Sequence, residues 1–107
     1  MEHCLVSIII PIYNVPDEFL NKCISSLFAQ TYADFEAILV DDGSNKETAE
    51  LCDSYASKDT RIKVIHQANS GVSEARNHGT VVSLGKYVMY VDGDDILAPK
   101  EIGRASW

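Results

Sequence analysis

The sequence is short of positive charge, and it has no long apolar run. Its 107 residues carry 9 Lys and Arg against 16 Asp and Glu, which gives a formal net charge of −7 at pH 7. Proteins that bind a nucleic-acid backbone or an anionic lipid surface select for clustered positive charge, so neither is expected as the main partner. No apolar run approaches the roughly 18 residues of a membrane span, and the chain starts without the basic segment of a secretory signal. We therefore expect a cytoplasmic protein, with peripheral attachment to the inner face of the membrane as an option for a longer form.

The cysteines are too few and too scattered for a disulfide framework. Cys4, Cys23 and Cys52 are odd in number and have neither metal-ligand nor redox spacing. We expect them to be small, buried apolar side chains in a reducing compartment. The hydrophobic fraction of 46% and the charged fraction of 23% are ordinary for a soluble globular chain. At this length, the sequence is one small domain or a piece of a larger one.

Two hydrophobic periods alternate along the chain. Short apolar runs that predict strands cover residues 5–10, 35–40, 62–66 and 87–91, and the first is typical of a strand buried on both faces. Apolar residues at helical spacing cover 20–28, 48–55 and 72–82 between them. Asp17 is placed to cap the first helix, Ser44 and Glu47 to form a capping box on the second, and Gly85 to end the third.

This alternation predicts an α/β fold with a parallel sheet and helices on both of its faces. We expect the strand order 3-2-1-4. In open parallel sheets, ligands bind outside the carboxyl ends of the strands. Polar or acidic clusters follow three of the four predicted strands, at 41–44, 66–70 and 92–95. Their convergence on one edge of the sheet is the main functional signal.

The acidic segment Asp92-Gly93-Asp94-Asp95, which follows the last predicted strand, is the sharpest of these clusters. Carboxylates one residue apart can point into one small volume, and Gly93 permits a tight turn. Carboxylate oxygens suit Mg²⁺ or Mn²⁺, ions that keep several waters and take phosphate oxygens as further ligands. The alternative is a solvated acidic turn or a helix cap.

The other strand ends offer groups that can recognise a nucleotide. One of Asp41 and Asp42 could accept a hydrogen bond from a nucleobase while the other caps the next helix. The alternative is that the two acids only form a turn and a helix cap and bind no ligand. Tyr13, just past Pro11, could stack on a base or could simply pack against the protein. His66 is expected to be a polar residue at a strand end rather than a ligand.

The third predicted helix begins near Ser70, and its N-terminus is electropositive. Gly71 permits a close approach of the backbone there. Arg76 shares a helix face with Ala75 and Gly79, in the stripe assigned to the core. An arginine on such a face must either pair with an acid or reach a ligand, and both readings stay open.

Five segments, taken together and in order, resemble the family 2 glycosyltransferases. They are residues 6–14, 20–32, 35–44, 69–79 and 90–95. The resemblance runs from residue 4 to about residue 97 and keeps the order and spacing of motifs that are weak one at a time. It implies a GT-A fold, which is a Rossmann-like three-layer sandwich. It also implies transfer of a sugar with inversion from a nucleotide sugar, usually a UDP-sugar, to an acceptor hydroxyl.

By the same resemblance, Pro11 and Tyr13 border the nucleobase, with Tyr13 against its face. Asp41 accepts the hydrogen bond of the base, and Asn69 and Arg76 close the nucleotide pocket.

The resemblance gives the acidic segment the remaining roles. Asp92 contacts the ribose or the metal shell, Asp94 binds the divalent metal, and Asp95 is an acid behind it. The metal is Mg²⁺ or Mn²⁺, and it stabilises the charge on the leaving diphosphate.

Family members continue for about another hundred residues, within the size of one larger domain. That portion supplies the acceptor side and the general base, so no catalytic residue is assigned to this chain. We expect residues 1–99 to be the nucleotide-sugar-binding half and residues 100–107 to be an atypical tail. The isolated chain should be weak or inactive, and its open sheet edge should favour a homo-oligomer. The acceptor is a saccharide or a lipid-linked group, used for polysaccharide or glycoconjugate synthesis.

Other classes place acids or nucleotides at parallel strand ends. A phosphatase with an aspartyl nucleophile needs most of its domain after the paired acids, and a phospho-acceptor signalling domain needs a fifth strand. A dinucleotide dehydrogenase needs a G-x-G-x-x-G motif where residues 11–14 stand. The remaining alternative is a non-catalytic nucleotide-binding or interaction fragment.

Overall fold

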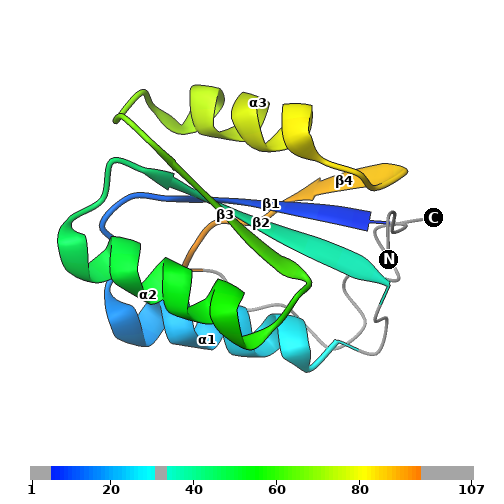
Figure 1. The fold of residues 1–107 in the computed structure, drawn as a ribbon, viewed down its shortest axis with the longest axis horizontal. Coiled ribbons are helices and arrows are strands. Elements are labelled where there is room, and N and C mark those ends of the chain that lie inside the picture. The colour runs from blue at the N-terminus through cyan, green and yellow to red at the C-terminus, as the bar shows by residue number, and fades with distance from the viewer. Residues whose placement is uncertain (1–5, 31–33, 95–107) are drawn as a thin grey trace.

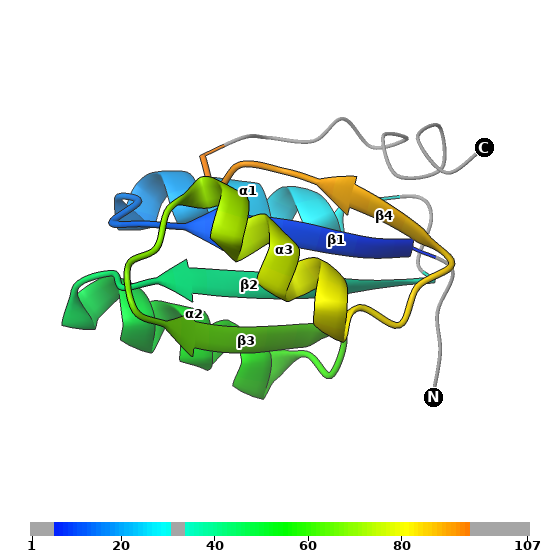
Figure 2. The same ribbon diagram turned by 90° about the horizontal axis from the view of Figure 1, so that it is seen from above.

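The protein is described by a computed structural model that covers residues 6–30 and 34–94. Its elements are β1 (Val6–Ile12), α1 (Asp17–Phe28), β2 (Phe35–Asp42), α2 (Lys46–Lys58), β3 (Ile62–Gln67), α3 (Val72–Val82) and β4 (Tyr87–Tyr90). The four strands form a parallel sheet in the order β3-β2-β1-β4, which confirms the predicted order. Figure 1 shows α1 and α2 on one face of the sheet and α3 on the other, and Figure 2 shows α3 from above. The predicted α/β architecture with three layers is therefore confirmed.

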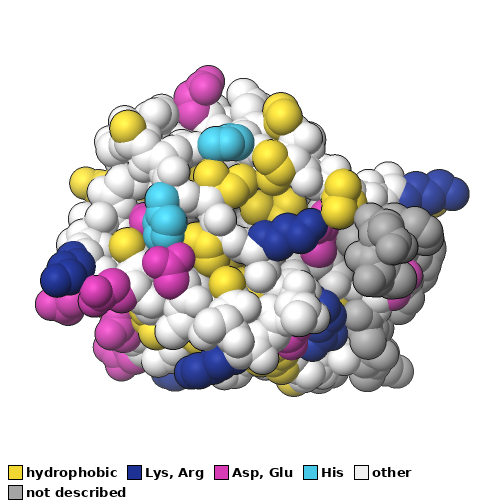
Figure 3. Space-filling view, viewed as in Figure 1, with side chains coloured by type: hydrophobic (Ala, Val, Ile, Leu, Met, Phe, Trp, Pro, Cys, Tyr) yellow, Lys and Arg dark blue, Asp and Glu magenta, His cyan; other side chains and the backbone are white. Residues whose placement is uncertain are grey.

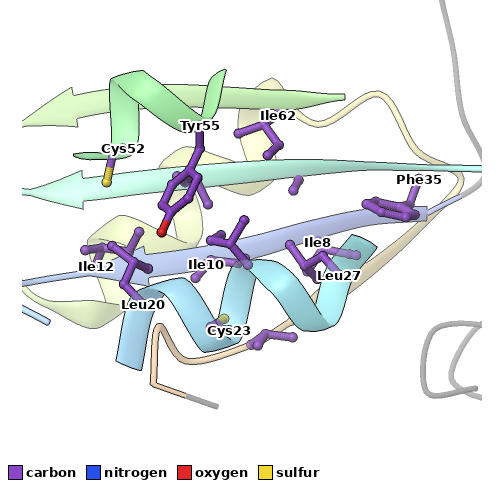
Figure 4. Close-up of a cluster of buried hydrophobic side chains, with 14 of the residues drawn as sticks. Ile8, Ile10, Ile12, Leu20, Cys23, Leu27, Phe35, Cys52, Tyr55 and Ile62 are labelled. Carbon is purple, nitrogen blue, oxygen red and sulfur yellow. The ribbon is translucent and has the colours of Figure 1, made fainter. Parts of the chain in front are cut away.

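The two central strands are buried on both faces, as the apolar run of β1 predicted. Ile8, Ile10 and Ile12 of β1 face α1 and α2 and pack with Leu20 and Leu27 of α1 in the larger core cluster (Figure 4). The opposite face carries a smaller cluster that consists of Ile9, Ile38, Val40 and Ala75. The second cluster is smaller because α3 alone covers that face.

Helix α3 approaches the sheet through a narrow stripe of small residues. A Cβ built on Gly79 would lie 2.5 Å from Cγ2 of Ile9, so a glycine lets the helix contact β1 this closely. Ala75 is fully buried in the same stripe. Val72 and Val82, which the sequence placed on this face, are largely exposed, so the buried face is narrower than predicted.

The predicted caps of the first two helices are wrong. Asp17 is the first residue of α1 rather than its cap, because Pro16 holds the cap position with no side-chain hydrogen bond. Asp17 can still act through its charge in the first turn of the helix. Helix α2 is capped by Asn45, whose side chain accepts a hydrogen bond from the Thr48 amide. Ser44 instead belongs to the loop network described below.

Gly85 does not end α3, because Ser83 already caps this helix. A Cβ on Gly85 would lie 2.6 Å from both the amide nitrogen and Oγ of Ser7, so this glycine allows the chain to pass close to β1. The Gly85 amide donates a hydrogen bond to Ser7 Oγ at 2.8 Å. The glycine thus serves the packing of the turn that leads into β4.

Cys23 and Cys52 are buried, as predicted, and neither forms a disulfide, whereas Cys4 lies outside the described residues. The tail that we distinguished at residues 100–107 also lies outside them. Within residues 6–30 and 34–94, every helix is too short or too polar to cross a bilayer.

Candidate nucleotide-binding edge

The carboxyl ends of all four strands lie at one edge of the sheet because the strands are parallel (Figure 1). Ile12 is in register with Asp41, and Asp41 is in register with His66. The turn after β4 reaches the same edge. A Cβ on Gly93 would lie 3.1 Å from Cγ2 of Val15 and 3.6 Å from the carbonyl oxygen of Pro11. The acidic turn therefore packs beside the end of β1, as the sequence predicted.

The loop after β1 is tied to the loop after β2. The Asn14 amide donates to Ser44 Oγ at 3.1 Å, and the Asn45 amide donates to Asn14 Oδ1 at 2.7 Å. The Ser44 hydroxyl lies 3.3 Å from the carbonyl oxygen of Ile12 and donates to it. Asn14 has a φ of 50°, in the left-handed region that asparagine tolerates better than most residues. These bonds fix the backbone on both sides of Tyr13.

The Tyr13 side chain is presented to solvent rather than packed against the protein. The residue is 56% exposed, and Pro11, two positions before it, is half-buried. An exposed aromatic side chain on a fixed backbone can stack on a planar ligand. Of the two readings that the sequence left open for Tyr13, packing against the protein is not what the structure shows, and ligand contact stays a prediction.

Asp41 and Asp42 are both buried, but they point to opposite faces of the sheet. Asp41 accepts a hydrogen bond from the Ser44 amide through Oδ1 and lies 2.7 Å from His66 Nδ1 through Oδ2, on the side of α2. Asp42 turns to the side of α3, where Oδ1 accepts from the Ser70 amide at 2.7 Å. Neither acid caps α2. Consecutive residues of a strand alternate between its faces, so only one of the two can join a given group of side chains.

Asp42 holds the loop that leads into α3, a role that the sequence interpretation missed. Its Oδ1 also accepts from Gln67 Nε2, and its Oδ2 accepts from the Gly71 amide at 3.0 Å. Burial alone would raise the pKa of Asp42, but hydrogen bonds from Gln67, Ser70 and Gly71 outweigh burial and lower it. The signal in the sequence was the alternation of strand faces, which places Asp42 and Gln67 on one side.

Asn69 lies against the same turn. Its Nδ2 donates to the backbone carbonyl of Asp42 at 3.0 Å. Gly43 has a φ of 74°, and a Cβ on it would lie 2.7 Å from the Asn69 amide nitrogen. Among the predicted nucleotide-binding residues, Asn69 is thus brought to the α3 side of β2, together with Asp42 rather than with Asp41.

Arg76 of α3 faces the end of β4. Its Nη2 lies 3.8 Å from Oδ1 of Asp92, and its guanidinium lies 5.7 Å from the centre of the Tyr90 ring. Both side chains of the ion pair are well exposed, so the pair contributes little to stability. The Nε of Arg76 is buried and has no hydrogen-bond partner among the described residues. The structure thus gives Arg76 an acidic partner at a long distance, and contact of this arginine with a ligand stays a prediction.

The predicted metal ligands Asp92 and Asp94 are both exposed at this edge. No group of three or more His, Cys, Asp or Glu side chains that could hold a metal occurs among the residues that the structure describes. Asp95 lies outside them. Two exposed carboxylates nevertheless fit a Mg²⁺ or Mn²⁺ ion that takes its other ligands from water and a diphosphate. The donor set fits such a metal only together with a substrate.

His66 is the second group that the sequence interpretation undervalued. Its Nδ1 lies 2.7 Å from Asp41 Oδ2, and its Nε2 lies 2.8 Å from Oδ1 of Asp53 in α2. Hydrogen bonds to Asp41 and then to Asp53 raise the pKa of His66 above its ordinary value. In Figure 3, histidine and acidic side chains touch near the strand ends at the left. The sequence could not reveal the contact, because the three residues come from different elements.

Comparisons with known proteins agree with this architecture. The profile of the family described as glycosyl transferase family 2 matches residues 7–105. The uncharacterized glycosyltransferase EpsJ of Bacillus subtilis is 51% identical over 94 residues, which are 88% of this chain and 27% of EpsJ. This chain thus spans about a quarter of that relative's length.

Solved structures of glycosyltransferases are similar to this chain in fold. A structure of residues 1–349 of S. aureus TarS in complex with UDP matches with a TM-score of 0.83 and 29% identity, over 95% of this chain and 31% of that one. GalNAc-T7 with UDP, GalNAc and Mn²⁺ matches with a TM-score of 0.75 and 26% identity, over 86% of this chain and 18% of that one. The fold is therefore that of the GT-A glycosyltransferases, and the chain belongs to glycosyl transferase family 2.

Proposed function

We propose that this chain is the donor-binding part of a glycosyltransferase that transfers a sugar from a nucleotide-diphosphate sugar, a UDP-sugar in the first instance. The observation that carries the proposal is the Arg76–Asp92 pair, in which an exposed guanidinium meets an exposed carboxylate at the carboxyl ends of the strands. A diphosphate ester offers two or more anionic acceptors to the exposed part of this arginine. The complex of the similar TarS with UDP supports the choice of nucleotide.

Each side chain has a part in nucleotide binding under this proposal. Tyr13 stacks on the base, and Pro11 borders it. Asp41 accepts a hydrogen bond from the base through lone pairs that its bonds to Ser44 and His66 leave open. Asn69, which lies on the other side of the end of β2 from Asp41, closes the pocket from the loop before α3.

The phosphate end of the ligand lies with Arg76, Asp92 and Asp94. Arg76 donates to diphosphate oxygens, and Asp92 contacts the ribose or the metal shell. Asp92 and Asp94 would hold Mg²⁺ or Mn²⁺, which stabilises negative charge on a leaving diphosphate. The structure of the similar GalNAc-T7 was determined with Mn²⁺.

The reaction that fits these groups is a direct displacement with inversion at the anomeric carbon, since it requires no protein nucleophile. A general base must still deprotonate the acceptor hydroxyl, and we place that base in the longer polypeptide, beyond residue 107. The isolated chain is then weakly active or inactive. The acceptor is a saccharide or lipid-linked group, consistent with polysaccharide or glycoconjugate synthesis at the cytoplasmic side of the membrane.

The test is thermal shift and calorimetry with UDP, with and without Mn²⁺. We expect UDP to stabilise the chain more when Mn²⁺ is present, and Asp94→Ala to abolish that metal-dependent gain. Asp34→Ala is the matched control, because Asp34 is also an exposed aspartate but directly precedes β2, at the other end of the sheet. No binding of UDP by the wild-type chain would contradict the proposal. Stabilisation by beryllofluoride without nucleotide would favour phosphotransfer at an aspartate.

The unpaired edge of β4 and its exposed apolar side chains support a homo-oligomer. Among the described residues, β4 has a strand neighbour on one side only. Val88 and Tyr90 are exposed on it, at 37% and 48%. An uncovered strand edge with apolar side chains is a template for pairing with another chain, and we propose a second copy as that partner. Light scattering checks this, and a monodisperse monomer would contradict it.

A further inference from the structure

His66 is held between two carboxylates from different elements. Nδ1 of its ring lies 2.7 Å from Oδ2 of Asp41 in β2, and Nε2 lies 2.8 Å from Oδ1 of Asp53 in α2. Asp41 is almost completely buried, whereas Asp53 is exposed. An ionised carboxylate only accepts hydrogen bonds, so both ring nitrogens must donate for both contacts to be favourable. Only the imidazolium form of histidine does that.

Hydrogen bonds through Asp41 and Ser44 connect His66 to the loop that carries Tyr13. Asp41 accepts a hydrogen bond from the Ser44 amide at 2.9 Å. The Ser44 hydroxyl in turn accepts a hydrogen bond from the Asn14 amide and donates one to the Ile12 carbonyl. Asp53, His66, Asp41 and Ser44 therefore form one hydrogen-bonded series that runs from the surface of α2 to the loop after β1. Tyr13 is flanked in sequence by Ile12 and Asn14, the two residues that Ser44 holds.

The charge of His66 decides whether this series is complete. Asp41 faces the ring from β2, and Asp53 faces it from α2. Cys52 of α2 also lies near both acids. Its burial, and to a smaller extent the charges of Asp41 and Asp53, raise the pKa of this thiol to about 12, so the thiol stays neutral. The pKa of His66 is raised by its hydrogen bonds to Asp41 and then to Asp53, so the doubly bonded form persists to a higher pH than in an ordinary histidine. It is lost as the pH rises through the raised pKa, because the neutral ring keeps a single N–H.

We propose that His66 is a positioning residue for the donor nucleotide: its imidazolium, bridged to Asp41 and Asp53, holds the 41–44 turn and the Tyr13 loop in the conformation that receives the base. This inference rests on the proposed function for the place of the nucleotide. His66 contacts no substrate in this scheme. It acts by fixing Asp41, and through Ser44 it fixes the backbone around Tyr13.

The affinity for UDP must then depend on pH through His66. Calorimetry between about pH 5.5 and 9 should show wild-type affinity falling about three- to tenfold on the alkaline side, the size expected for the net loss of one ordinary hydrogen bond. His66→Gln should bind UDP weakly at every pH and lose that fall. His78→Gln is the matched control, because the other described histidine contacts the neutral Gln67. Titration of UDP itself is common to all variants and cancels in the comparison.

Asp53→Asn provides a second variant that should fold, since Asp53 is exposed on a helix surface. Removing this carboxylate lowers the pKa of His66, so the pH at which UDP affinity falls should move down while the affinity at low pH changes little. A purely structural role for His66 would not move that midpoint. NMR titration of the imidazole should give the same midpoint as the binding data.

The outcomes separate the two proposals. If the wild-type chain binds no UDP at any pH, the proposed function fails and this inference fails with it. If the wild type binds UDP and the pH profile is the same in His66→Gln, or does not move in Asp53→Asn, this inference alone is overturned.

Discussion

Glu36 is a buried acid on β2 whose replacement should destabilise the fold measurably. Its Oε2 accepts from the Ser7 hydroxyl at 2.5 Å and from the Leu84 amide at 2.6 Å, and its Oε1 accepts from Lys63 Nζ at 2.6 Å. These bonds join β1, β2, β3 and the turn before β4. The glycine in that turn, Gly85, is itself bonded to Ser7. Glu36 therefore anchors the strand that ends in the acidic turn.

The cost of Glu36→Gln follows from which bonds an amide can keep. An amide oxygen in the place of Oε2 can still accept from Ser7 and Leu84, but the amide NH₂ then faces the ammonium of Lys63. Lys63 is 43% exposed and can turn into water, so one charge-assisted bond is lost without leaving a buried cation. We expect a loss of about 1.5–3 kcal/mol in the free energy of unfolding.

Urea denaturation with linear extrapolation measures this loss. The matched control is Asp59→Asn, which breaks the more exposed pair of Asp59 with Arg61 and should cost less than about 1 kcal/mol. The two variants should differ because Glu36 is 6% exposed and has two further donors. Equal costs in the two variants would refute the reasoning that burial and shared donors make Glu36 special.

Two other predictions concern the turn after β2. Gly43→Ala should destabilise the chain by about 1–2 kcal/mol from the left-handed backbone alone, and more if the contact with Asn69 must open, which urea denaturation will show; an unchanged midpoint would contradict this. The pKa of Asp42 is lowered in the folded state, so its contribution is present above the unfolded pKa and is lost as the pH falls through the folded one. Stability measured against pH should therefore fall on the acid side less steeply in Asp42→Asn than in the wild type.

The sequence by itself determined the architecture of this protein. Apolar runs such as 5–10 and 35–40 predict strands, the first of them buried on both faces. The helical spacing between these runs predicts a helix that connects two parallel strands. The five ordered motifs pointed to the family, which the profile match confirms. These features could be predicted because hydrophobic periodicity and motif order are properties of the chain along its length.

The tertiary structure decided which side chains meet. Asp41 and Asp42 are neighbours in sequence, yet the side chain of one joins His66 and that of the other joins Gln67, because a strand sends consecutive side chains to opposite faces. Asn45 rather than Ser44 caps α2, since Ser44 is bonded to the loop after β1.

The bridge of His66 and the anchoring by Glu36 are also decided by the tertiary structure. Asp53 and Asp41 reach His66 from a helix and a neighbouring strand, and Glu36 meets donors from three other segments. Each contact joins residues 13 or more positions apart. Such pairs are fixed by the register of the sheet and by helix packing, whereas local propensity and spacing act only along the chain.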